Sequence, residues 1–132
     1  MTAWLEEAEH LLRLAWRDHQ TFCILLDSGR AALAPICFHA QQAAEKALKA
    51  VMTVQKCDFP RTHSLSELAR LVLDSGLAPP CSAADYMRLT PFAVEFRYDE
   101  RAPTLLDGAQ AGQIASQTLE WAASIVAAAG NA

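Results

Sequence analysis

Apolar residues recur along most of the chain at intervals of three and four positions, which is the spacing of an amphipathic helix. They predict a first helix over about residues 2–26 and a second over about residues 30–55, with a break at residues 27–29. The apolar side of the second segment is rich in alanine, which allows neighbouring helices to approach closely. We therefore expect this second helix to be central.

Three later helices are predicted from their start signals. Three pairs have the spacing of a helix-capping box, a serine or threonine followed by an acidic residue three positions later: Ser64 and Glu67, Ser82 and Asp85, and Thr104 and Asp107. Pro91 lies inside the fourth helix, which should kink or restart there. Short connections between such helices favour antiparallel neighbours, so the pattern predicts an all-α fold, an up-and-down bundle of four to five helices.

Composition and charge narrow the class of protein. The 132 residues fit a single domain spanning residues 1–132, and a net charge of −4 argues against coating nucleic acid by bulk attraction. The first ten residues, MTAWLEEAEH, carry acidic side chains where a signal peptide has basic ones. No apolar run reaches the roughly 18 residues of a transmembrane helix. We expect a cytoplasmic protein that does not enter the membrane.

The cysteines do not have the spacing of metal ligands. The four of them lie 14, 20 and 24 residues apart and form no C-x-x-C pair, at Cys23, Cys37, Cys57 and Cys81. We expect reduced, mostly buried thiols, with no metal and no cofactor.

One polar arc of the second helix is a candidate site. At 100° per residue, a narrow arc carries an imidazole, an amide and two ammonium groups, from His39, Gln42, Lys46 and Lys49. Any solvated helix face has a similar composition, and a histidine at its edge is more often a hydrogen-bonded boundary residue than a catalyst. Lys46 lies closest to His39 in direction. Glu45 and Lys49 have the spacing of an ordinary surface ion pair.

Basic residues gather just after this arc. Residues 46–63 carry Lys46, Lys49, Lys56 and Arg61 against Asp58 alone. His63 precedes a helix start, where peptide N–H groups bind phosphate, so Arg61 and His63 are candidate ligands for an anion. The alternative is that Thr62 and His63 only shape the loop. The tryptophans, Trp4, Trp16 and Trp121, are most simply anchors of the core or of an interface.

Three stretches together resemble the HEPN domain family: CFHAQQAAEKALKAV at residues 37–51, RTHSLSEL at residues 61–68 and VEFRYDE at residues 94–100. The resemblance covers nearly the whole chain and implies a bundle of four to five helices that commonly forms a homodimer. It also implies a partnership with a small nucleotidyltransferase of the MNT type. Many members of the family are toxins that cleave RNA without a metal.

That activity in the family depends on an R-x(4–6)-H motif in which a polar residue follows the arginine. Arg97 matches the arginine, but Tyr98 follows it, and residues 102–104 are Ala, Pro and Thr. Arg13 and His19 also have the motif spacing, on the polar face of the first helix, and we interpret that match as accidental. The histidine of the motif is therefore missing after Arg97, so no catalytic residue is assigned and the chain is expected not to be an enzyme. An ion pair for Arg97 is at least as plausible as a ligand contact.

Three hypotheses follow. The first is a HEPN protein that binds a nucleotide or RNA phosphate and is paired with an MNT-type nucleotidyltransferase in a toxin–antitoxin-like system; its candidate ligand-binding residues are His39, Gln42, Lys46, Lys49, Arg61, His63, Arg97 and Tyr98. The second is a metal-independent ribonuclease toxin that uses a displaced histidine. The third is a ligand-free helical scaffold. The chain lacks a Gly-Ser and paired-carboxylate motif, so any nucleotide transfer would belong to a partner.

Overall fold

The computed structural model describes residues 2–94 and 106–131, and within them every regular element is helical. The long helices are α1 (Ala3–Ser28), α2 (Leu33–Val54) and α5 (Gly108–Gly130). The short helices are α3 (Leu65–Asp74) and α4 (Ala83–Leu89), and the 3₁₀ turn η1 (Thr90–Ala93) follows α4 directly. The predicted all-α bundle is confirmed.

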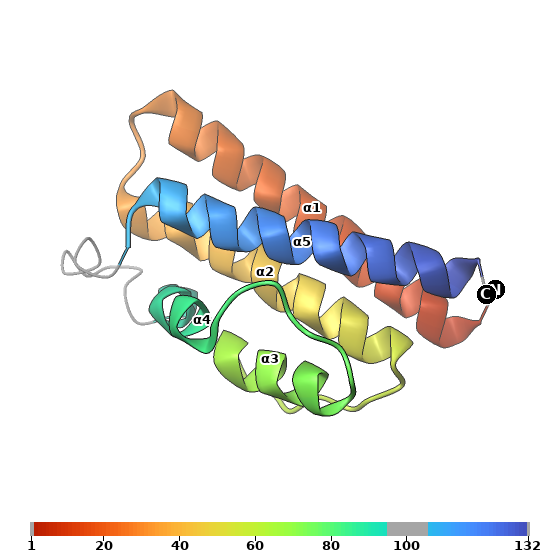
Figure 1. The fold of residues 1–132 in the computed structure, drawn as a ribbon. Helices are drawn as coiled ribbons and strands as arrows, with labels where there is room; N and C mark the ends of the chain where they lie inside the picture. The colour runs from red at the N-terminus through yellow and green to blue at the C-terminus, as the bar shows by residue number, and fades with distance from the viewer. Residues whose placement is uncertain (1, 95–105, 132) are drawn as a thin grey trace.

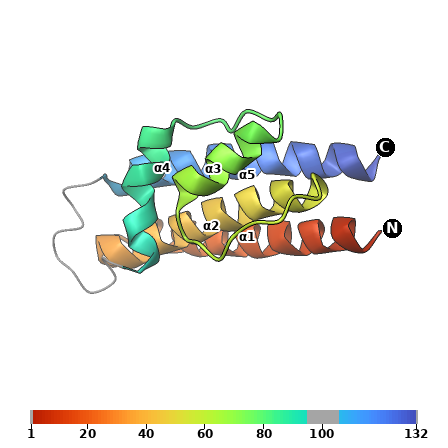
Figure 2. The same cartoon turned by 90° about the horizontal axis from the view of Figure 1, so that it is seen from below.

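The three long helices lie side by side and the short ones cover one side of α2 (Figure 1). α2 contacts all the other helices and is central, as the alanine pattern predicts. Figures 1 and 2 show that α5 runs parallel to α2 and antiparallel to α1. The reason is the long connection from α2 to α5, which carries α3 and α4 and returns the chain to the end where α2 begins.

The prolines and caps set the helix boundaries. Pro35 lies in the first turn of α2, where its missing N–H is harmless, and Pro91 lies in η1, where the fourth helix restarts in 3₁₀ form. α5 begins at Gly108, with Asp107 as its N-cap, rather than near Thr104. The Asp107 carboxylate accepts from the Gln110 N–H at 2.7 Å, and the Gln110 side chain accepts from the Asp107 N–H at 2.9 Å.

Small residues bring the long helices together. The alanines of α2 are fully buried at Ala40, Ala43, Ala44 and Ala47. On α5, a Cβ at Gly112 would lie 2.7 Å from the Phe22 ring of α1, so this glycine allows α1 and α5 to approach. Within the described residues, no helix is both long and apolar enough to cross a membrane.

Candidate functional site

The polar arc of α2 divides between two carboxylates. The first is Asp18 on α1, whose side chain is 14% exposed. His39 Nδ1 lies 3.0 Å from Asp18 Oδ1, and the Lys46 ammonium pairs with the second oxygen. We call these three residues the Asp18 cluster. It joins α1 to α2 and brings together the two arc residues, His39 and Lys46, that lie closest in direction.

The second carboxylate is Glu45 on α2, whose side chain is only 6% exposed. Gln41 Nε2 donates to Glu45 Oε1 at 3.1 Å, and His63 Nδ1 lies 2.8 Å from the same oxygen. Lys49 Nζ donates to Oε2 at 3.1 Å. We call these four residues the Glu45 cluster. The expectation of an ordinary surface pair between Glu45 and Lys49 is wrong, because the carboxylate is buried beneath its partners.

The partners of Glu45 keep it ionised. Burial alone would raise the pKa of this carboxyl, but hydrogen bonds from Gln41, His63 and Lys49, together with the Lys49 charge, outweigh burial and lower the pKa. A buried carboxylate with this many donors is electrostatically satisfied. It can therefore hold His63 and Lys49 in fixed positions.

Gln41 is a member of the cluster that sequence reasoning missed. It is fully buried and also donates to the His63 carbonyl at 3.1 Å, so it holds the backbone of the loop residue whose ring is bound by Glu45. Gln42, on the predicted arc, donates to Gln41 Oε1 at 2.7 Å, so it is linked to Glu45 through Gln41. The available signal was an amide on the apolar side of α2, four residues before a glutamate, because a buried amide needs a polar partner.

The loop between α2 and α3 presents the exposed part of the site. The His63 side chain is 58% exposed although its Nδ1 is bound, so its other ring edge faces solvent. Arg61 is exposed, and among the described residues it forms no ion pair. Lys49 Nζ stands 5.4 Å from the centre of the Phe59 ring. Lys49 and His63 therefore meet at Glu45, and Arg61 belongs to the same loop as His63.

The start of α3 offers fewer free N–H groups than a bare helix end. The Ser64 N–H donates to Thr62 Oγ1 at 3.1 Å, and the Leu65 N–H donates to Thr90 Oγ1 at 3.0 Å. The Ser64 hydroxyl accepts from the Glu67 N–H, and Glu67 places a negative charge in the first turn. Any anion here would depend on side chains more than on the helix end.

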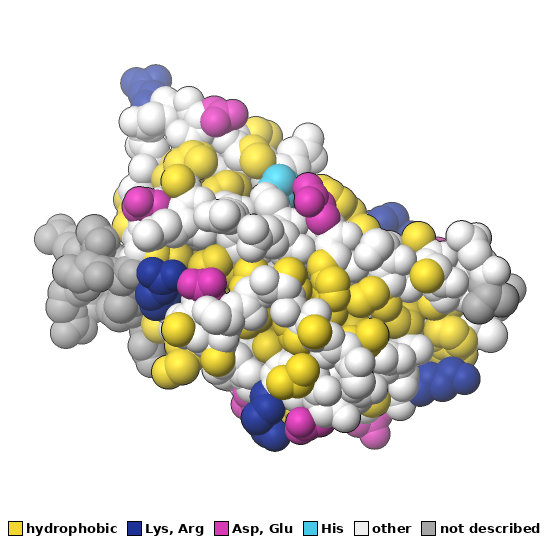
Figure 3. Space-filling view, in the orientation of Figure 1, with side chains coloured by type: hydrophobic (Ala, Val, Ile, Leu, Met, Phe, Trp, Pro, Cys, Tyr) yellow, Lys and Arg dark blue, Asp and Glu magenta, His cyan; other side chains and the backbone are white. Residues whose placement is uncertain are grey.

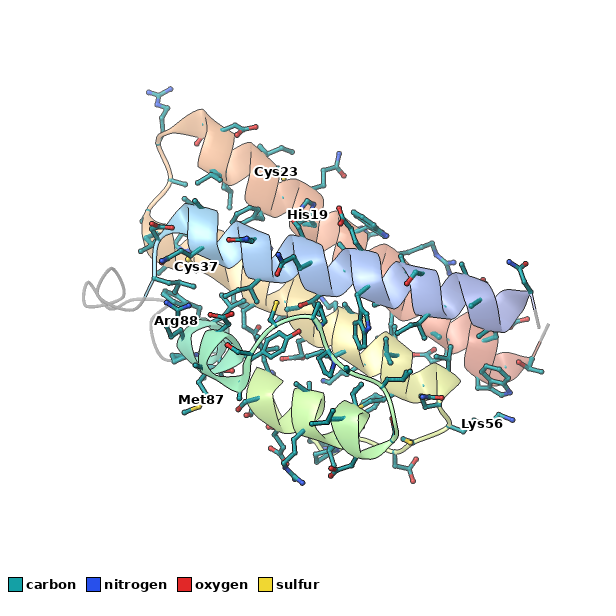
Figure 4. All side chains as sticks on the ribbon, viewed as in Figure 1. His19, Cys23, Cys37, Lys56, Met87 and Arg88 are labelled. Carbon is teal, nitrogen blue, oxygen red and sulfur yellow. The ribbon has the colours of Figure 1, made fainter. Side chains whose placement is uncertain are left out.

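The arginine of the family motif lies elsewhere in the chain. Arg97 and Tyr98 fall outside the described residues. The alternative match, Arg13 and His19, does not converge: His19 Nε2 lies 3.0 Å from Ser116 Oγ on α5, whereas Arg13 is exposed and lines a surface hollow with Trp16. Figure 4 labels His19 on α1, beside α5.

The remaining chemistry is limited in the part of the chain that the structure describes. It contains no group of three His, Cys, Asp or Glu residues able to hold a metal ion. The four cysteines are free thiols. Burial, with the nearby Asp107 charge, raises the pKa of the Cys37 thiol to about 12, so it stays protonated and unreactive.

A central α2 flanked by α1 and α5, with short helices on one side, defines an all-α helical-bundle domain. The HEPN domain model matches residues 3–127, and the chain belongs to this family. The crystal structure of an archaeal HEPN homologue is similar, with a TM-score of 0.62 and 21% identity over 91% of this chain and 98% of that chain. At this identity the likeness shows the fold. No curated protein matched the sequence.

Proposed function

We propose that this HEPN-domain protein binds the phosphate of a nucleotide or RNA at Lys49, Arg61 and His63. The observation that carries the proposal is the buried Glu45 carboxylate, which holds the exposed His63 and the partly buried Lys49, with the exposed Arg61 two residues before His63 in the same loop. Groups that are fixed before binding lose little conformational freedom when the ligand arrives. Phosphate oxygens accept hydrogen bonds from such donors, and charge strengthens these bonds.

The other predicted ligand residues have different roles in this proposal. His39 and Lys46 fix the position of α2 against α1 through Asp18, and Gln42 supports Gln41. They shape the surface on which the ligand rests. Arg97 and Tyr98 remain predicted contacts.

Charge reversal at Arg61 tests the proposal. Arg61→Glu should weaken binding of ATP or a short RNA by roughly tenfold or more, because it replaces a charged donor with a repelling group. Arg30→Glu is the matched control, since Arg30 is also exposed and lies in the loop between α1 and α2. Calorimetry that detects no binding to the unmodified protein would favour the ligand-free scaffold instead.

We also propose a homodimer that works with an MNT-type nucleotidyltransferase in a toxin–antitoxin-like system. Family membership supports this, and so do large apolar side chains left exposed on α1, where Trp16 is 43% and Ile24 is 61% exposed. Figure 3 shows further apolar side chains along the middle of one face, with Lys and Arg scattered at its edges. Sedimentation of a monomer at micromolar concentration would contradict the dimer.

One observation favours a second candidate, the metal-independent ribonuclease. Both His39 and His63 have Nδ1 on a carboxylate, which fixes the ring and leaves Nε2 for proton transfer. With Arg97 stabilising the phosphorane charge, such a histidine would complete a cleavage site. RNA cleavage in EDTA that is lost in Arg97→Ala and in either His39→Ala or His63→Ala would establish this candidate. Absence of cleavage would exclude it.

A further inference from the structure

A hollow of about 450 Å³ lies at the C-terminal end of α2, where the chain turns into the loop toward α3. It is lined by residues of the α1 start, the α2 end and the loop, namely Trp4, Thr53, Lys56, Cys57, Asp58 and Phe59. Its volume is in the range that holds a small ligand. Figure 4 labels Lys56 at this end of the bundle.

Ammonium groups stand over both aromatic rings near this hollow. Lys56 Nζ lies 4.8 Å from the centre of the Trp4 ring, and Lys49 Nζ lies 5.4 Å from the centre of the Phe59 ring. Among the described residues, Lys56 has no ion-pair partner. The hollow thus combines flat apolar surfaces with the Lys56 ammonium group and the Asp58 carboxylate, and Lys49 adds a second positive charge beside Phe59. With two lysines against one carboxylate, a planar ligand that carries negative charge matches this combination better than a cationic one.

The backbone at Lys56 is unusual for a lysine. Its φ is 57°, and it occupies the position after the α2 C-cap where its N–H donates to the Thr53 carbonyl at 3.0 Å. Glycine is the common residue at this left-handed position, and Gly29 follows α1 in that way. A lysine is strained here, and its side chain lines the hollow. The strain is a second observation that points to a role for this side chain.

We propose that the hollow takes the base of a nucleotide, either free or in single-stranded RNA, stacked on Trp4 or Phe59. The proposal rests on the proposed function, because the phosphate would lie toward Lys49 and the Glu45 cluster. Lys49 belongs to both parts: it bonds Glu45 and stands over Phe59. Lys56 lies seven positions after Lys49 and two beyond the last residue of α2, a separation of about 10 Å at the helical rise and a length that one nucleotide covers. Stacking on aromatic rings tolerates any base, so little base specificity is expected.

The test compares AMP, adenosine and ribose 5-phosphate by calorimetry on the full chain. AMP should bind roughly tenfold more tightly than ribose 5-phosphate, because only AMP stacks. Phe59→Leu should remove most of that advantage. Trp16→Leu, which changes an exposed aromatic residue on the outer part of α1, should leave it unchanged. Equal binding of AMP and ribose 5-phosphate would overturn the base site.

Tryptophan fluorescence gives a second readout of base stacking, which does not depend on whether Phe59→Leu folds correctly. In a background of Trp16→Phe and Trp121→Phe, Trp4 is the remaining tryptophan, and AMP should quench it while ribose 5-phosphate should not. Unchanged emission at saturating AMP would contradict stacking on Trp4, and a Phe59→Leu variant that also binds AMP normally would overturn the proposal.

A short oligoadenylate that binds more tightly than AMP would identify RNA as the source of the base, and the reverse order would identify a free nucleotide.

The two proposals fail differently. If ribose 5-phosphate binds through Arg61 and His63 and AMP binds no more tightly, the result supports the phosphate site and contradicts the base site. If adenosine binds, Phe59→Leu abolishes adenosine binding, and Arg61→Glu has no effect on AMP binding, the result supports the base site and contradicts the phosphate site. If none of the three compounds binds, both fall.

Discussion

The Asp18 cluster and the Glu45 cluster contain the same three kinds of side chain but have different roles in the fold. In each, a carboxylate of low exposure holds a histidine through Nδ1 and a lysine through its ammonium group. The Asp18 cluster joins two long helices, and its His39 side chain is 28% exposed. The Glu45 cluster holds a loop, and its His63 side chain is 58% exposed. A charged cluster between helices stabilises packing, whereas one that fixes a loop histidine can also present it to a ligand.

Removing the Glu45 carboxylate should have the largest effect on stability. Glu45→Ala removes one of the two acceptors of the fully buried Gln41 and the counter-charge of Lys49, so we expect a loss of about 2–4 kcal/mol in the free energy of unfolding. Urea unfolding followed by circular dichroism measures it. If Glu45→Ala loses less free energy of unfolding than Asp18→Ala does, the Glu45 cluster is not the more stabilising of the two.

Asp18→Ala should cost less, about 1–2 kcal/mol. Its partners His39 and Lys46 are 28% and 25% exposed and can turn toward water once the carboxylate is gone. The same urea experiment measures this variant, and binding of AMP serves as its control. Phosphate binding that falls as much as in His63→Gln would show that the Asp18 cluster contacts the ligand.

Acid should weaken the Glu45 cluster in a defined window. The pKa of Glu45 is lower in the folded protein than in the unfolded chain, so its contribution is complete above the unfolded value, about 4.3, and is lost as the pH falls through the lower folded value. The difference in stability between the unmodified protein and Glu45→Gln should be constant above about pH 5 and shrink below about pH 4. A difference that stays constant down to about pH 2 would contradict an ionised, stabilising Glu45.

Lys56→Gly should have the smallest effect and the opposite sign. Glycine relieves the left-handed backbone strain, while the contact with Trp4 is lost, so we expect a net gain of about 0.5 kcal/mol in stability. Thermal unfolding measures it. Lys56→Ala, which keeps the strain and loses the contact, should be less stable than the unmodified protein, and equal stability of the two variants would show that the backbone is relaxed.

Helical periodicity predicted the fold because it depends on local spacing. It located the break after α1, the restart at Pro91 and the central place of α2. The start of α5 was predicted too early because Asp107 was interpreted as the second residue of a capping pair that Thr104 begins. Asp107 is instead the N-cap, and its partner is Gln110, an amide rather than a carboxylate.

The site was predicted less well because it depends on contacts between distant parts of the chain. The arc of α2 was correct as a set of polar residues, but Asp18 comes from another helix and lies 21 residues before His39. The burial of Glu45 and its link to His63 follow from the way the loop packs on α2. The predicted antiparallel pairing of the first two helices places Trp4 and Lys56 at the same end of the bundle, but it does not predict that their side chains meet.

Calorimetric titration of AMP tests most directly whether the Glu45 cluster presents His63 to an anion. We predict that His63→Gln weakens AMP binding by roughly tenfold, whereas His39→Gln leaves it unchanged, because the His63 side chain is 58% exposed and the His39 side chain joins α1 to α2. Unchanged affinity in His63→Gln, or an equal loss in His39→Gln, would contradict the role given to His63.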